Sequence, residues 1–214
     1  MDLERCRYIV VEGPIGAGKT SLARQIAARF GTEPLLERPQ DNPFLERFYE
    51  DAAHFALPTQ LTFLFQRVDQ LRDLGERETF RHAVVSDFML DKDPLFARLN
   101  LANAEFQLYE KVYAHVKPKA PTPDLVIYLQ ATVETLAERV RERDLGYERR
   151  IAPQYLARLA DAYSRYFHEY VDAPLLIVNS ERLNFVANPE HLALLFAHIE
   201  AMRGQRAFFN LGQS

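Results

Sequence analysis

One glycine-rich segment constrains the fold of this chain more than any other part of it. Residues 13–20 read GPIGAGKT, the pattern of a phosphate-binding loop between a strand and a helix. Its glycines let backbone N–H groups turn inward around phosphate oxygens, Lys19 adds a positive charge, and Thr20 offers a hydroxyl to Mg²⁺. We therefore expect ATP to bind to this whole loop: Gly13, Pro14, Ile15, Gly16, Ala17, Gly18, Lys19 and Thr20.

Short apolar runs alternate with helical patterns along the rest of the chain. The strand candidates are residues 8–11, 35–36, 83–85, 125–129 and 175–178. Apolar residues at helical spacing cover residues 20–30, 57–74, 94–116, 133–143, 153–171 and 188–202, and Asn42–Pro43 is typical of another helix start. This alternation predicts a single α/β domain over residues 1–214, with a five-stranded parallel sheet flanked by helices on both faces. We expect residues 205–214 to be a loosely held tail.

Composition excludes several classes of function. The formal net charge of −4 argues against binding to nucleic-acid polymers or to a membrane surface, because both usually need a basic face. Cys6 is the only cysteine, so an intrachain disulfide is impossible and a reducing compartment is favoured. No apolar run approaches the roughly 20 residues of a membrane span. We expect a cytoplasmic protein.

The segment after the fourth strand candidate is rich in arginine. Residues 133–150 read VETLAERVRERDLGYERR, and its arginines could clamp transferring phosphates as a lid at about residues 139–152. Composition alone favours a solvated helix face with Glu–Arg pairs, whereas the position between a strand and the next helix favours a lid. The Asn-Lys-x-Asp motif of GTPases does not occur, which favours a kinase.

Two carboxylates follow strand candidates. Glu37 comes just after the second candidate and Asp87 just after the third. Ligands of open parallel sheets bind at the carboxyl ends of the strands. One carboxylate could accept the proton of a substrate hydroxyl, and the other could hold Mg²⁺. Each taken alone could equally be a helix cap or a loop residue.

Together these stretches resemble the deoxynucleoside kinases, and among them the bacterial enzymes that phosphorylate deoxyadenosine or deoxyguanosine. The resemblance spans roughly residues 8–167. It is carried by EGPIGAGKT (12–20), DNPFLERFYED (41–51), TQLTFLFQR (59–67), DKDPLFARL (91–99), PDLVIYL (123–129) and the lid (139–148). It implies a P-loop kinase fold, a homodimer, and Mg²⁺-assisted transfer of the ATP γ-phosphoryl group to the 5′-hydroxyl of a deoxynucleoside.

The same resemblance assigns roles to residues outside the loop. Glu37 would be the general base at the 5′-hydroxyl, and Asp87 would help Thr20 to hold Mg²⁺. Tyr49 and Glu148 would bind the 3′-hydroxyl. The base pocket would consist of Gln60, Arg67 and Asp93.

Two lid arginines, Arg139 and Arg143, match residues that bind the donor and the moving phosphoryl group. Relatives often read Arg-Gly-Arg in the lid, whereas residues 143–145 here are Arg-Asp-Leu. Either Arg141 or Arg149 would then replace the missing arginine, or the lid would contribute less.

A second departure follows Asp87. Many relatives carry an arginine directly after this carboxylate, whereas Phe88 occupies the position here. Lys92 is the nearest basic residue in the segment. We hypothesise that Lys92 supplies the missing positive charge beside the phosphoryl acceptor.

Base preference depends on Gln60. An amide offers both an acceptor and donors, which match the amino group and adjacent ring nitrogen of adenine, or of cytosine. Guanine presents two adjacent donors and suits a carboxylate better, and guanosine-preferring relatives tend to carry Glu here. We predict deoxyadenosine, with deoxyguanosine and deoxycytidine as alternatives.

Two rival functions remain open at this point. A thymidylate kinase would need a site for an acceptor phosphate, which Glu37 would repel. A kinase-like subunit without catalysis would not need the full set of catalytic residues that this chain carries: Lys19, Thr20, Glu37, Asp87, Arg139 and Arg143.

Overall fold

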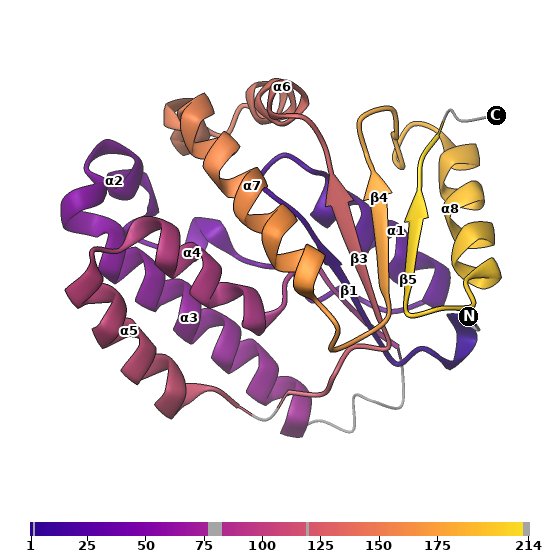
Figure 1. Ribbon diagram of the computed structural model, residues 1–214, viewed down its shortest axis with the longest axis horizontal. Coiled ribbons are helices and arrows are strands. Elements are labelled where there is room, and N and C mark those ends of the chain that lie inside the picture. The colour runs from indigo at the N-terminus through magenta and orange to yellow at the C-terminus, as the bar shows by residue number, and fades with distance from the viewer. Residues whose placement is uncertain (2, 77–82, 119, 212–214) are drawn as a thin grey trace.

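The computed structural model describes residues 1, 3–76, 83–118 and 120–211. Within them, five parallel strands form one sheet in the order β2-β1-β3-β4-β5 (Figure 1). The strands are β1 (Tyr8–Glu12), β2 (Val84–Ser86), β3 (Leu125–Gln130), β4 (Leu175–Asn179) and β5 (Arg206–Phe209). The predicted α/β fold with a five-stranded parallel sheet is confirmed.

The α-helices of the described residues pack on both faces of the sheet. They are α1 (Lys19–Phe30), α2 (Leu45–Glu50), α3 (Ala52–Glu76), α4 (Asp93–Asn100), α5 (Asn103–Val116), α6 (Val133–Arg143), α7 (Pro153–Glu169) and α8 (Pro189–Ala201). Short 3₁₀ helices are η1 (Leu3–Arg5), η2 (Pro39–Asp41), η4 (Leu90–Lys92) and η5 (Gly146–Arg150). In Figure 1, α2–α5 gather on one side of the sheet, and α8 lies beside β5 on the other.

Strand β1 shows how the core is divided. Its residues are buried throughout, as expected of a central parallel strand. Because successive side chains point to opposite faces, Ile9 and Val11 join a cluster with α1 and α8, whereas Tyr8 and Val10 join a cluster with α3 and α7. Glu12 ends the strand immediately before the glycine-rich loop.

The fifth strand is not the one that the sequence predicts. Residues 35–36 do not form a strand; Leu35 makes only an isolated parallel bridge to Ser86. The strand β5 lies instead in residues 205–214, so the predicted loose tail is wrong for Arg206–Phe209, while residues 212–214 lie outside the described part. Pairing with β4 and bonds from the Arg206 guanidinium to carbonyl oxygens at the end of α7 hold this segment.

Two helix predictions also need correction. The pattern over residues 94–116 is two helices, because the chain breaks between α4 and α5 at Leu101, which is buried, and Ala102. The Glu105 carboxylate accepts a hydrogen bond from the Ala102 N–H and so caps α5. The helix start expected at Asn42–Pro43 comes later, at Leu45.

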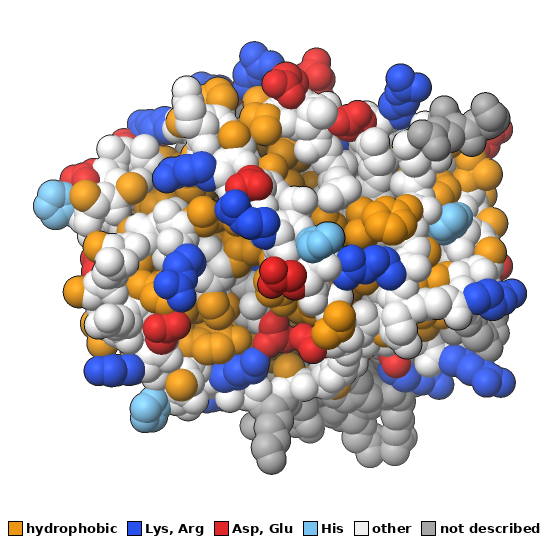
Figure 2. All heavy atoms as spheres, in the orientation of Figure 1, with side chains coloured by type: hydrophobic (Ala, Val, Ile, Leu, Met, Phe, Trp, Pro, Cys, Tyr) orange, Lys and Arg blue, Asp and Glu red, His pale blue; other side chains and the backbone are white. Residues whose placement is uncertain are grey.

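Charges of both signs are interspersed on the face drawn in Figure 2, where Lys and Arg alternate with Asp and Glu. This face therefore carries no field of a single sign. Among the described helices, none combines the length and the apolar character that crossing a bilayer requires.

The placement of β5 predicts a contrast between two neighbouring phenylalanines. Phe209 is 9% exposed and packs in the core, whereas Phe208 in the same strand is 66% exposed. Phe209→Ala should lower the free energy of unfolding by about 3 kcal/mol, because it leaves a cavity. The matched change Phe208→Ala should cost less than about 0.5 kcal/mol. Urea titrations of both variants measure the difference, and equal, small effects would show that residues 206–209 are not a strand.

Candidate active site

The glycine-rich loop leads from β1 into α1. Gly16 has a φ of 87°, and a Cβ atom there would lie 2.6 Å from the carbonyl oxygen of Leu136. Only glycine combines this backbone conformation with such a close approach. Gly18 caps the N-terminus of α1 with a φ of 97°, and Gly31 ends the helix at the position that the sequence predicts.

Hydrogen bonds hold the Lys19 and Thr20 side chains of the loop. The Lys19 Nζ donates hydrogen bonds to the carbonyl oxygens of Gly13 (2.8 Å) and Pro14 (3.2 Å), so its ammonium group lies against the loop. The Thr20 hydroxyl donates to Asp87 Oδ2 over 2.5 Å. Burial of Lys19 and the neighbouring Lys92 lower the pKa of Lys19, which favours binding of an anion that restores its charge.

Asp87 connects the loop to Glu37, the predicted general base. Its Oδ1 accepts the backbone N–H of Glu37 over 2.8 Å, while its Oδ2 accepts the Thr20 hydroxyl. Burial and the nearby Glu37 carboxylate raise the pKa of Asp87, and the bond from Thr20 acts in the opposite direction. A cation bound between Thr20 and Asp87 would relieve this repulsion.

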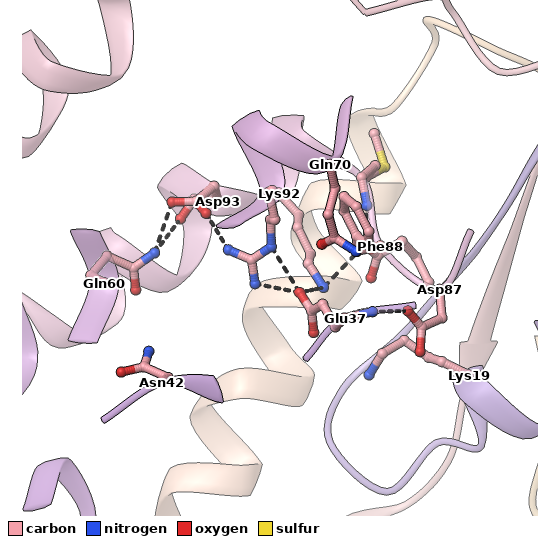
Figure 3. A network of polar contacts seen from close by, with 12 residues as sticks. Lys19, Glu37, Asn42, Gln60, Gln70, Asp87, Phe88, Lys92 and Asp93 are labelled. Carbon is pink, nitrogen blue, oxygen red and sulfur yellow. Dashed lines mark hydrogen bonds and ion pairs between the residues drawn. The ribbon is translucent and has the colours of Figure 1, made fainter. Parts of the chain in front are cut away.

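A row of buried polar side chains continues from Glu37. In Figure 3, Lys19 and Asp87 lie at one end, Gln60 and Asp93 at the other, and Glu37 and Lys92 between them. The Arg67 guanidinium connects the two parts, because it bonds to both Glu37 and Asp93. Arg67 and Asp93 are buried. Arg67 comes from α3, and Asp93 begins α4.

Asp93 does not line the cavity itself, but it binds two side chains that do, Gln60 and Arg67. Its Oδ1 accepts hydrogen bonds from Gln60 Nε2 (2.8 Å) and from the Tyr109 hydroxyl, and its Oδ2 accepts one from Arg67. Tyr109 is buried on α5. Asp93 thus fixes the orientation of Gln60 and Arg67, and the Gln60 Oε1 is the amide atom left to accept a further hydrogen bond.

The neighbours of Glu37 favour the ionised form of its carboxyl group. Burial alone would raise the pKa of its carboxyl group, but the Arg67 guanidinium and the Lys92 ammonium outweigh burial and lower the pKa to about 2. Its Oε1 accepts the Arg67 Nε–H over 2.8 Å and lies 3.3 Å from Lys92 Nζ. Glu37 is therefore a carboxylate at any pH near neutrality.

Lys92, for which the sequence analysis hypothesised a role beside the acceptor, lies next to Glu37. Its ammonium is buried, 3.3 Å from Glu37 Oε1 and 3.2 Å from Glu12 Oε1. Phe88, which follows Asp87, is fully buried in the core cluster that contains Tyr8 and Val10 of β1. A cation thus contacts Glu37 although the residue after Asp87 is apolar.

One cavity is lined both by the donor loop and by the predicted acceptor residues. Donor-loop residues and acceptor residues line the same space: Gly16, Gly18, Lys19, Thr20, Glu37, Tyr49, Gln60, Arg67, Asp87, Lys92, Arg143 and Glu148. Of the predicted acceptor residues, Asp93 alone is absent from the lining, because it lies behind Gln60 and Arg67. Apolar walls that the sequence analysis did not assign come from Phe48, Phe63, Phe96, Tyr147 and Tyr155.

The predicted lid borders this cavity. Arg143 at the end of α6 bonds to both carboxylate oxygens of Glu148, with Arg143 Nε 2.9 Å from Glu148 Oε2. The Tyr147 ring stacks on Tyr49 with centroids 6.4 Å apart and an interplanar angle of 6°. The lid segment therefore contacts the wall to which the 3′-hydroxyl was assigned.

The remaining lid arginines lie apart from this cavity. Arg139 donates to the carbonyl oxygen of Ser180 (2.6 Å) and lines a second cavity beside the loop. That cavity also contains Arg182, which the sequence analysis did not single out. Arg149 pairs with Asp144 at the surface, and neither it nor Arg141 lines either cavity.

The fold and the site together define a class of enzyme. A phosphate-binding loop faces a partly buried carboxylate that is held by two cations, at the carboxyl edge of a parallel sheet. This arrangement is that of a P-loop kinase, in which a nucleotide donor and a hydroxyl acceptor meet in one cavity.

Comparison with known proteins gives the family. A model of the family described as "Deoxynucleoside kinase" matches residues 9–202, and this chain belongs to that family. The deoxyguanosine kinase of Bacillus subtilis is 30% identical over 91% of this chain and 97% of that protein. The deoxyadenosine kinase of Lactobacillus acidophilus is 28% identical over 85% of this chain and 89% of that protein.

A solved structure supports the fold. The deoxyadenosine kinase from M. mycoides with bound dATP is 24% identical and aligns with a TM-score of 0.78, over 91% of this chain and 99% of that chain.

The low pKa of Glu37 predicts how stability depends on pH. A folded-state pKa of about 2, below the ordinary 4.5, means that the carboxylate stabilises the fold above pH 4.5 and loses this contribution as the pH falls toward 2. Glu37→Gln should cost about 3 kcal/mol at pH 7, because Arg67 and Lys92 lose a buried partner.

Urea titrations at several pH values test this. The gap between the parent protein and Glu37→Gln should shrink below pH 4.5 by at most about 1.4 kcal/mol per pH unit. The control Glu33→Gln changes an exposed carboxylate and should show no such gap. A gap for Glu37→Gln that stayed constant down to pH 3 would contradict the pairing.

Proposed function

We propose that this enzyme transfers the γ-phosphoryl group of ATP to the 5′-hydroxyl of a deoxynucleoside, and that deoxyadenosine is the favoured acceptor. One observation carries the proposal: the Glu37 carboxylate lies in the same cavity as Lys19 and Thr20 on one side and Gln60 on the other. A nucleoside with its base at Gln60 would direct its 5′-oxygen toward Glu37 and the donor loop.

Glu37 would orient the 5′-hydroxyl and accept its proton. A carboxylate with a pKa of about 2 is a weak base, so it acts mainly by holding the hydroxyl in line with the γ-phosphorus. This suits phosphoryl transfer, in which the transition state is loose and positioning supplies most of the catalysis. Lys92 would stabilise the negative charge that gathers between Glu37 and the transferring group.

The residues present fit a Mg²⁺ ion. Thr20 and Asp87 bring a hydroxyl and a carboxylate oxygen within 2.5 Å of each other, and Mg²⁺ prefers few protein oxygens together with substrate phosphates. Bound there, the ion would neutralise phosphate charge. Lys19 would contact the same phosphates from the loop.

Tyr49 and Glu148, which line the same cavity, would hold the 3′-hydroxyl. Arg143, which bonds to Glu148, lines both cavities and so borders the donor as well. Closure of this segment over the phosphates would exclude water and limit ATP hydrolysis. Arg139, in the second cavity, would contact the donor nucleotide.

The choice of base follows from the way in which Gln60 is held. Because Gln60 Nε2 is bonded to Asp93, Gln60 Oε1 faces the base as an acceptor, and Arg67 has N–H groups to spare. Adenine matches this pair with its 6-amino group and a ring nitrogen. Guanine would match it with N1–H and O6 but adds a 2-amino group that needs a further acceptor. Deoxyguanosine is the second candidate, because the Bacillus subtilis relative carries that name.

The ratio of kcat/KM for deoxyadenosine to that for deoxyguanosine tests the base preference. We expect deoxyadenosine to be favoured at least about tenfold, the size of one good hydrogen bond. Gln60→Glu should lower kcat/KM for deoxyadenosine, because the new carboxylate would lie against the buried Asp93 carboxylate and lose the hydrogen bond that orients the side chain. A parent enzyme that prefers deoxyguanosine, or a Gln60→Glu variant that gains deoxyadenosine activity, would overturn this proposal.

If Lys92 acts in phosphoryl transfer, removing its charge should lower turnover far more than it weakens binding of the deoxynucleoside. Lys92→Met keeps the length of the side chain and removes its charge, so kcat should fall about 10²-fold while the Kd of the deoxynucleoside changes less than about threefold. Lys111→Met, at an exposed position on α5, is the matched control. Unchanged turnover in Lys92→Met would reject a role for Lys92 in transfer.

Homodimer formation and a cytoplasmic location stay predictions. Leu108 on α5 and Val171 just after α7 are exposed apolar residues, which supports a dimer contact through these two helices.

A further inference from the structure

Glu12 is a buried carboxylate to which the roles above give no function. It ends β1, directly before the loop, and has no exposed surface. Its Oε1 accepts the Met89 N–H (2.8 Å) and lies 3.2 Å from Lys92 Nζ. Its Oε2 accepts the Gly13 N–H and the Tyr163 hydroxyl, each over 3.1 Å.

These four donors use the hydrogen-bonding capacity of an ionised carboxylate. They also come from three separate parts of the site: the first residue of the loop, the turn from Met89 to Lys92 that follows β2, and α7. A protonated Glu12 would have to give up one of these bonds. Burial raises the pKa of Glu12, while Lys92 and Lys19 act in the opposite direction. A buried charge is costly unless it is paired in this way, and Lys92 is its nearest cation.

We infer that Glu12 is a positioning residue for phosphoryl transfer, which holds the Lys92 ammonium between the donor loop and Glu37. The two carboxylates lie at nearly equal distances from Lys92 Nζ, 3.2 Å for Glu12 and 3.3 Å for Glu37. Without the charge of Glu12, the ammonium would be drawn toward Glu37 alone. The inference rests on the proposed roles of Glu37 and Lys92.

A merely structural carboxylate would behave differently from a positioning one. Glu12→Gln keeps the shape and one acceptor, but it removes the charge that balances Lys92. We expect kcat to fall about 30-fold or more, a loss typical of a small misplacement of a catalytic group, with KM for ATP and for the deoxynucleoside within threefold of the parent. Glu169→Gln, an exposed residue at the end of α7, is the matched control and should leave both unchanged.

A double-mutant cycle with Lys92→Met distinguishes action through Lys92 from any other effect. If Glu12 acts through Lys92, adding Glu12→Gln to Lys92→Met should change kcat less than about threefold. Equal losses in both backgrounds, or turnover of Glu12→Gln within threefold of the parent, would overturn the inference. Melting curves identify variants that do not fold.

Should Glu12→Gln alone not fold, the double variant still decides, because the two changes together remove one charge of each sign. Turnover of the double variant within threefold of Lys92→Met supports the inference, and a further tenfold loss rejects it. The proposed role of Lys92 fails separately, if Lys92→Met turns over like the parent protein.

Discussion

The contact of the Arg67 guanidinium with two carboxylates is the interaction on which the rest of the site depends. Arg67 is buried and bonds to Glu37 on one side and to Asp93 on the other. Two carboxylates could not be buried so close together without a cation between them, because desolvation disfavours their charged forms. The same contact lowers the pKa of Glu37 and aims Gln60 through Asp93. Loss of Arg67 would therefore affect the acceptor site from the base to the 5′-hydroxyl.

The parallel sheet explains why this row of charges meets the donor loop. Strands β1 and β2 are neighbours, so Glu12 at the end of β1, the loop after it, and Asp87 after β2 lie at one edge. Asp87 then bonds to Thr20 across that edge, and its other oxygen holds the backbone of Glu37. Helix α3 brings Gln60 and Arg67 to the same side. The sequence segments are far apart, and the topology alone brings them into one cavity.

The sequence predicts a feature well when the residues that form it lie close together in the chain. The loop could be found because glycine spacing, Lys19 and Thr20 are all within eight residues. The strand β5 could not, since four residues without a buried run give no periodic signal and its stability comes from β4 and Arg206. Likewise, Asp93 was assigned to the base pocket, but only the fold shows that it lies behind Gln60.

Glu12 illustrates the same limit for function. In the sequence it is one more residue beside the loop, and its four bonds come from residues as distant as Tyr163. Lys92 was hypothesised from a missing arginine, and the structure adds the two carboxylates that hold it.

The central claim is that the cavity positions a sugar 5′-hydroxyl against the ATP γ-phosphate. Its most direct test is ³¹P NMR of the product formed from ATP and deoxyadenosine, with proton coupling retained. We expect one product, a monophosphate whose phosphorus couples to two 5′ protons, formed in step with ADP. A 3′-phosphate, coupled to one proton, or ADP release without a nucleotide product would contradict it.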